Sequence, residues 1–122
     1  MSAARIRQTF ERYTQCVSAG DVAGLVALYS EDACIEIPVG GPVHRGIDAI
    51  RTFYADNELA ESLAISGTLC IAGDEAAVPL VACVRRDGRL YELDVIDVAH
   101  FREDGRFSRL RAFFDLEGAR PL

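Results

Sequence analysis

The sequence predicts an α+β protein with a cone-shaped fold, in which N-terminal helices pack on a strongly curved antiparallel sheet. Hydrophobic residues recur at helical spacing mainly in the first half of the chain, up to residue 56. From residue 62 onward they alternate with polar residues, and two Asp-Gly turns, at residues 87–88 and 104–105, separate the alternating runs. At 122 residues the chain is long enough for one domain with a hydrophobic core, which we expect to span residues 1–122.

Three helices are expected before the main part of the sheet, over residues 2–19, 21–30 and 47–56. Gly20 favours the end of the first helix, and Asp21 is a suitable N-cap for the second. Between the second and third helices, residues 33–37 form an expected strand. Proline and glycine make residues 38–42 an irregular loop.

Four further strands are expected, over residues 62–71, 76–85, 93–101 and 107–114. Pro79 predicts an edge or a bulge in the second of them. Side chains of a strand alternate between faces, so the third strand places five residues on one side: Leu93, Val95, Asp97, Ala99 and Phe101. A carboxylate in such an apolar row must be paired, solvated or kept protonated with a raised pKa. The pattern leaves open which of these applies to Asp97.

Helices closing a bent sheet would leave a conical cavity with a mostly apolar wall. Its expected apolar lining is Val17, Ile35, Ile37, Phe53, Leu80, Ala82, Val95, Leu110, Ala112 and Phe114. Its expected polar groups are Tyr13, Tyr29, Tyr54 and Asp97. An apolar cavity with a few convergent polar groups is typical of a small-molecule site, so a small apolar ligand is the expected partner.

Composition argues against other classes of function. The net charge of −6 disfavours a nucleic-acid partner. No apolar run approaches a membrane span, and the charged N-terminus lacks a signal-peptide core, so a soluble, cytoplasmic protein without a membrane partner is expected. The cysteines have no metal-ligand or disulfide spacing and lie among apolar neighbours, which predicts reduced, buried thiols at Cys16, Cys34, Cys70 and Cys83. No metal and no organic cofactor is expected.

Several segments, in order along the chain, resemble the bacterial ketosteroid isomerases: Arg12-Tyr13 followed by Gly20-Asp21, residues 27–33, Phe53-Tyr54, residues 94–98 with Phe101, and residues 111–114. The similarity runs from about residue 5 to residue 116. These enzymes belong to a nuclear-transport-factor-2-like superfamily that also contains polyketide-cyclase-like proteins. The resemblance implies a Δ5-3-ketosteroid isomerase, in which Tyr13 and a protonated Asp97 donate hydrogen bonds to a developing oxyanion. A carboxylic acid kept neutral by an apolar site is a known feature of that family. The resemblance also implies that Tyr29 and Tyr54 form a hydrogen-bonded chain with Tyr13.

One position departs from the family pattern. The general base of these isomerases is an aspartate immediately before a proline, where this chain has Ile37 before Pro38. Alternation turns the neighbouring Glu36 to the opposite face, unless a bulge swings it inward. The sequence therefore predicts an isomerase-like protein that keeps oxyanion stabilisation but lacks the usual base.

Two alternatives stay open. One is a non-catalytic protein that binds a steroid or phenol. The other is a cone-fold enzyme of another reaction, such as a cyclase or dehydratase, which would need a histidine or a second acid in the cavity. His44 and His100 are poorly placed for this role, whereas Asp115 is expected near the rim.

A homodimer is expected through the outer face of the sheet. Alternation places four apolar residues on that face: Ile96, Val98, Phe107 and Phe113. Apolar residues on the back of a sheet indicate a partner surface, and the family resemblance implies that the partner is a second copy.

Overall fold

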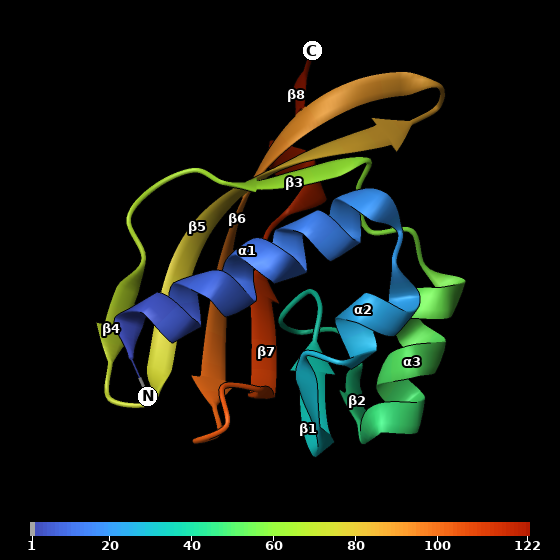
Figure 1. Ribbon diagram of the computed structural model, residues 1–122. Helices are drawn as coiled ribbons and strands as arrows, with labels where there is room; N and C mark the ends of the chain where they lie inside the picture. Colours follow the sequence, from blue (N-terminus) through green and yellow to red (C-terminus); the bar gives the residue numbers. More distant parts are fainter. Residues whose placement is uncertain (1) are drawn as a thin grey trace.

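The computed structural model describes residues 2–122 as helices packed on one face of a curved, mostly antiparallel sheet (Figure 1). This architecture confirms the expected fold class. The helices are α1 (Ala3–Ala19), α2 (Val22–Val26), α3 (Ile47–Asp56) and the short 3₁₀ helix η1 (Leu116–Gly118). The strands are β1 (Tyr29–Glu36), β2 (Val43–Arg45), β3 (Ser62–Ile65), β4 (Cys70–Ala72), β5 (Glu75–Arg86), β6 (Arg89–Phe101), β7 (Phe107–Phe113) and β8 (Arg120–Pro121).

The sheet has the strand order β2-β1-β7-β6-β5-β3, with β4 paired to β5 and β8 paired to β6. All neighbours are antiparallel except β1 and β7, which run parallel. Figure 1 shows α1 crossing one face of the sheet, while α2 and α3 lie together beside β1 and β2. The two long strands β5 and β6 form a curved hairpin, which is the longest paired part of the sheet.

The ends of α1 follow from its sequence. The Ser2 hydroxyl accepts a hydrogen bond from the Arg5 amide at 3.1 Å, which caps the first turn. Gly20 has a left-handed backbone with φ of 66°, and the Asp21 amide then donates to the Cys16 carbonyl at 2.9 Å. Glycine adopts this conformation without steric cost, so the helix ends at the predicted place.

The second predicted helix is shorter than expected, because α2 ends at Val26 and Tyr29 already belongs to β1. The Leu28 carbonyl accepts a hydrogen bond from the Phe107 amide at 2.8 Å, which ties this segment to the sheet. Pairing with a distant strand here outweighs the local helical pattern, as tertiary contacts often do.

Other element boundaries also differ from expectation. The strand predicted over residues 62–71 is two strands, β3 and β4, which pair with successive parts of β5. Pro79 lies between these two paired parts, where its carbonyl accepts a hydrogen bond from the Ser66 amide at 3.0 Å but no ladder pair needs an amide. Beyond the predicted loop, β2 pairs with β1, and it has only three residues. The Asp-Gly hairpin between β5 and β6 is confirmed, with positive φ at both Asp87 and Gly88.

Phe107 faces the core and not the solvent, which corrects the prediction that it lies on the outer face. The pairing of β6 with β7 places Phe101 opposite Phe107 but His100 opposite Arg109, so Ser108 is an extra residue. A bulge of this kind changes which residues share a face. Phe107 and Leu110, three residues apart, are therefore both fully buried.

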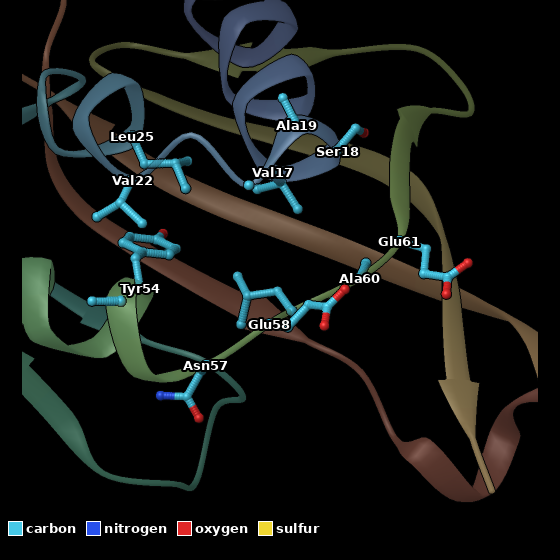
Figure 2. Close-up of a pocket in the computed structure, with 13 residues that line it drawn as sticks. Val17, Ser18, Ala19, Val22, Leu25, Tyr54, Asn57, Glu58, Ala60 and Glu61 are labelled. Carbon is cyan, nitrogen blue, oxygen red and sulfur yellow. The ribbon is translucent and has the colours of Figure 1, made fainter. Parts of the chain in front are cut away.

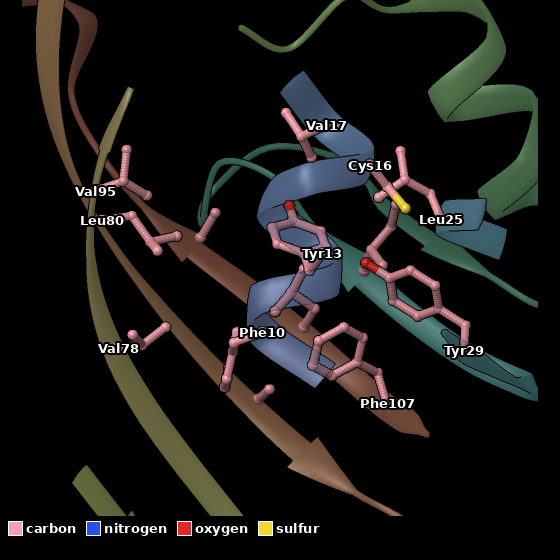
Figure 3. Packing of buried hydrophobic residues seen from close by; sticks show 14 of the residues in the cluster. Phe10, Tyr13, Cys16, Val17, Leu25, Tyr29, Val78, Leu80, Val95 and Phe107 are labelled. Carbon is pink, nitrogen blue, oxygen red and sulfur yellow. The ribbon is translucent and has the colours of Figure 1, made fainter. Parts of the chain in front are cut away.

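The centre of the core is an aromatic cluster formed by Phe10, Tyr13, Phe101 and Phe107, with ring centroids between 5.1 and 5.9 Å apart for the contacting pairs. Figure 3 shows Phe10, Tyr13 and Phe107 of this cluster. The cysteines are only partly as predicted. All four are free thiols, but Cys16 alone is buried and Cys70 is exposed. Within residues 2–122, no helix is both long and apolar enough to cross a membrane.

Candidate active site

Asp97 is the buried acid in the middle of β6. Its inward-facing neighbours Leu93, Val95, Ala99 and Phe101 are all buried, as the alternation predicted. The Asp97 side chain is itself only 1 % exposed, and within residues 2–122 its Oδ2 atom makes no hydrogen bond. Loss of hydration disfavours the charged form, so burial raises the pKa of Asp97 to about 8. At neutral pH the carboxyl therefore carries a proton that it can donate.

Tyr13 reaches the same cavity from α1. Helical spacing places Phe10, Tyr13 and Val17 on the inward face of α1, and Tyr13 packs edge-on against Phe107 with ring centroids 5.9 Å apart (Figure 3). Burial raises the pKa of the Tyr13 phenol well above its usual value, and the nearby Tyr54 and Asp97 raise it further. A phenol in this state is a neutral hydrogen-bond donor at all ordinary pH values.

Tyr29 and Tyr54 lie beside Tyr13 and are joined by a hydrogen bond of 2.6 Å between their hydroxyls. Tyr29 comes from β1 and Tyr54 from α3, so the pair also links these two elements. Burial raises the pKa of both phenols, and Tyr54 influences the ionisation of Tyr13 and of Tyr29. The proximity of these phenols is consistent with the expected tyrosine chain, although the hydrogen bond itself joins Tyr29 and Tyr54.

Tyr13 and Asp97 line a common cavity of about 70 Å³ with an otherwise apolar wall. The wall consists of Val17, Ile37, Leu59, Ala60, Leu63, Leu80, Ala82, Val84, Leu93, Val95, Ala112, Phe114 and Leu116. The cavity therefore contains two neutral hydrogen-bond donors, one from α1 and one from β6, in an otherwise apolar wall.

Five of the residues predicted to contact a ligand do not line this cavity. Ile35 and Leu110 are paired with each other on β1 and β7 and are completely buried in the core. Phe53 packs against His44 with ring centroids 4.9 Å apart. Tyr29 and Tyr54 are hydrogen-bonded to each other outside this cavity, and Tyr54 lines a second hollow between α1, α2 and α3.

Ile37 lies in the cavity wall, at the position where the resemblance implies a catalytic base. Glu36 is turned to the other face of β1. Its carboxylate accepts hydrogen bonds from the Gly40 amide at 3.1 Å and from Arg111 Nε at 3.0 Å. These two bonds hold the pKa of Glu36 below its usual range. Glu36 is therefore fixed away from the cavity and does not replace the base in this arrangement.

The other candidate acids and bases are also outside the cavity. His44 belongs to β2, and His100 bonds Asp74 and Ser108 on the outer side of the sheet. Asp115 caps η1 by accepting a hydrogen bond from the Glu117 amide at 3.0 Å. His100 and Asp115 thus have hydrogen-bond partners elsewhere, and His44 packs against the Phe53 ring.

The lining expected from the sequence left out six residues of the cavity wall: Leu59, Ala60, Leu63, Val84, Leu93 and Leu116. Leu59 and Ala60 follow α3 in a segment without regular structure, where periodicity gives no information. Val84 continues the inward row of β5 and was identifiable by alternation alone.

Residues 10–110 match the profile of the SnoaL-like domain family, which is part of the nuclear-transport-factor-2-like superfamily. This match covers most of the chain, including Tyr13 and Asp97. The chain belongs to the SnoaL-like domain family.

Two individual relatives extend this result. A steroid Delta-isomerase from Nocardioides simplex is 33 % identical over 112 residues, which cover 91 % of this chain and 90 % of the relative. A solved structure of the epoxide hydrolase/cyclase-like enzyme SalBIII, described for its role in pyran ring formation in polyether salinomycin, superposes with a TM-score of 0.85 and 25 % identity. It covers 98 % of this chain and 97 % of its own. This SnoaL-like protein therefore resembles both a steroid Delta-isomerase and a cyclase-like enzyme.

Proposed function

We propose that this SnoaL-like protein binds a flat apolar ketone or phenol and stabilises negative charge on its oxygen through Tyr13 and a neutral Asp97. The observation that carries the proposal is the buried carboxyl of Asp97, whose Oδ2 atom has no hydrogen-bond partner within residues 2–122 and which lines the same apolar cavity as Tyr13. Preorganised donors in a site of low dielectric stabilise a developing oxyanion far better than water does. The similarity to a steroid Delta-isomerase supports a steroid-like ketone as the substrate.

The proposed reaction moves a carbon–carbon double bond into conjugation with the ketone. A proton leaves the carbon between the two double bonds, its electron pair shifts toward the carbonyl, and the oxygen becomes negative. Tyr13 and Asp97 then donate to that oxygen. One proton is then added to the terminal carbon of the dienolate. The reaction is therefore an isomerisation with no net change in composition.

Ile37 offers no lone pair at the expected place of the base, so we expect water to accept the proton. A positioned base contributes about a hundred- to ten-thousand-fold in rate. The proposed isomerase is accordingly slow. If its rate does not exceed that in buffer, the protein only binds the ligand.

A cyclase is the second candidate, supported by the structural likeness to SalBIII. In this version the neutral Asp97 acts as a general acid. Its proton passes to an oxygen leaving group as a hydroxyl of the same substrate attacks the carbon, and that hydroxyl releases a proton to water. This chemistry uses the same raised pKa, and water takes the place of the histidine or second acid that such an enzyme would otherwise need in the cavity.

We also propose that two copies associate through the outer face of the sheet. Ile96 and Phe113 are directly opposite each other on β6 and β7 and are 50 % and 41 % exposed. Arg111 lies over the Phe113 ring at 5.2 Å and also pairs with Glu36, so charges of both signs surround the apolar centre. A twofold contact between identical patches of this kind is self-complementary.

The proposed function is tested by measuring, with calorimetry, the affinity of a flat phenol such as 2-naphthol for the wild type, Tyr13→Phe and Asp97→Leu. Each substitution removes one donor, and we expect about a tenfold or greater loss of affinity for each. Asp48→Asn, which changes an exposed carboxylate on α3 that pairs with Arg51, is the matched control. Equal affinities in all four proteins would refute the oxyanion site. Conversion of a Δ5-3-ketosteroid, followed by the absorbance of the conjugated enone, then distinguishes an isomerase from a binding protein.

A further inference from the structure

The cavity beside Asp97 shares a wall with a second hollow. This recess, of about 610 Å³, lies between the C-terminal end of α1, α2 and the end of α3 (Figure 2). Val17, Leu59 and Ala60 line both hollows. The apolar cavity and the recess therefore meet at these three side chains, which we call the shared wall.

The two volumes indicate that a ligand occupies more than the cavity. Ligand pockets are usually about 300–1,000 Å³, so a cavity of about 70 Å³ is too small for a steroid-sized molecule, whereas the recess is in the usual range. A flat ligand with its oxygen at Asp97 must extend past the shared wall. Leu59 and Ala60 belong to residues 57–61, which connect α3 to β3 without regular structure. Such a segment moves at a lower free-energy cost than a helix or a central strand.

The recess differs from the cavity in its chemistry. Its lining includes the carboxylates of Glu58 and Glu61 together with Asn57 and Ser18 (Figure 2). The Glu61 carboxylate accepts a hydrogen bond from Arg85 Nε at 2.6 Å, and Glu58 also acts electrostatically on the same guanidinium. Two carboxylates thus face one arginine, which leaves one net negative charge at this side of the recess.

We propose that the ligand extends from Tyr13 and Asp97 across the shared wall into the recess, and that its far end carries a cationic or hydroxyl group. Glu58 is the residue that selects against an anionic end. This inference rests on the proposed function, because that function places the carbonyl or phenol end of the ligand at Asp97. The ligand class is therefore a flat ketone or phenol with a polar, non-anionic tail.

The experiment compares three phenols that share one flat ring system. One has no tail, one has a short tail ending in a quaternary ammonium group, and one has the same tail ending in a carboxylate. Calorimetry at low ionic strength gives the Kd values. We expect the ammonium ligand to bind about three- to tenfold more tightly than the carboxylate ligand, as one unit charge several ångströms away near a protein surface would produce.

Variants of Glu58 assign the preference to this residue. Glu58→Gln should bring the ratio of the two Kd values close to one, and Glu58→Lys should reverse it. Asp48→Asn removes a carboxylate from the N-terminal end of α3, whereas Glu58 follows the C-terminal end of that helix. It should leave the ratio unchanged, because Asp48 does not line the recess.

Two results would overturn the inference. If both tailed phenols bind the wild type equally, or if the preference persists in Glu58→Gln, the far end of the ligand is not in the recess. The oxyanion site then still stands, provided that the phenol without a tail binds and loses affinity in Asp97→Leu. If that parent phenol fails to bind, the proposed function and this inference fall together.

Discussion

Replacing Asp97 with asparagine should remove a pH dependence of stability that the buried acid causes. An aspartic acid has a pKa of about 3.9 in an unfolded chain, whereas burial raises the pKa of Asp97 to about 8 in the folded protein. Between these values the folded state holds one more proton than the unfolded state. The free energy of unfolding therefore decreases as pH rises through this window, and the contribution of the neutral acid is lost above the folded pKa.

The size of the effect follows from the same two values. Each pH unit within the window costs about 1.4 kcal/mol. Between about pH 5.5 and pH 7.5 the wild type should lose about 2.5 kcal/mol through Asp97, the slope falling slightly as pH approaches 8. Asparagine has nearly the same shape and no charge, so the variant should lack this loss and become the more stable protein toward neutral pH.

The assay is urea unfolding, followed by circular dichroism under reducing conditions, at several pH values in that window. The informative quantity is the difference in unfolding free energy between Asp97→Asn and the wild type. Carboxylates paired with arginine, such as Asp94, have a lowered pKa and stay ionised across the window, so their contributions cancel in this difference. Asp48→Asn serves as the control. A difference that stays constant with pH would show that Asp97 is ionised and solvated, and the reasoning about a neutral donor would be wrong.

Four further outcomes are expected. Ile37→Asp should raise the rate of Δ5-3-ketosteroid isomerisation about a hundred- to ten-thousand-fold, measured by enone absorbance; no increase would show that residue 37 is not at the reacting carbon. Tyr54→Phe should cost about 1–3 kcal/mol in urea unfolding, because the buried Tyr29 hydroxyl loses its partner, and an unchanged midpoint would contradict this. Leu110→Ala should cost about 2–5 kcal/mol through a core cavity while leaving phenol binding measurable. Ile96→Glu should convert the proposed dimer to a monomer in sedimentation experiments with a stability change of about 0.5 kcal/mol or less; an unaltered molecular mass would reject that interface.

The sequence predicts the direction of side chains most reliably where a periodic pattern extends over many residues. The inward rows of α1 and β6 extend over several turns or alternations, so periodicity alone places Tyr13 and Asp97 in the interior, and both are buried. The family resemblance then indicated that these two residues meet, which alternation alone does not show. Both side chains line the same cavity.

The errors occur where pairing with distant strands decides the structure. Tyr29 was assigned to a helix because its local pattern is helical, yet it begins β1 and pairs with Phe107. The short strand β2 has too few residues to show alternation. The inward position of Phe107 depends on one extra residue in β7, and no local pattern marks such a residue.

The same extra residue has a consequence for changes in chain length. Ser108 contacts His100, and its presence separates Phe107 from Leu110 by an odd number of positions, although both face the core. Removal of Ser108 would return β7 to plain two-residue alternation with Phe107, Leu110 and Ala112 still on one side. A deletion of Ser108 is therefore compatible with an unchanged cavity wall. Deletion of Leu110 instead would turn Ala112 outward and place the Arg111 guanidinium on the inward face.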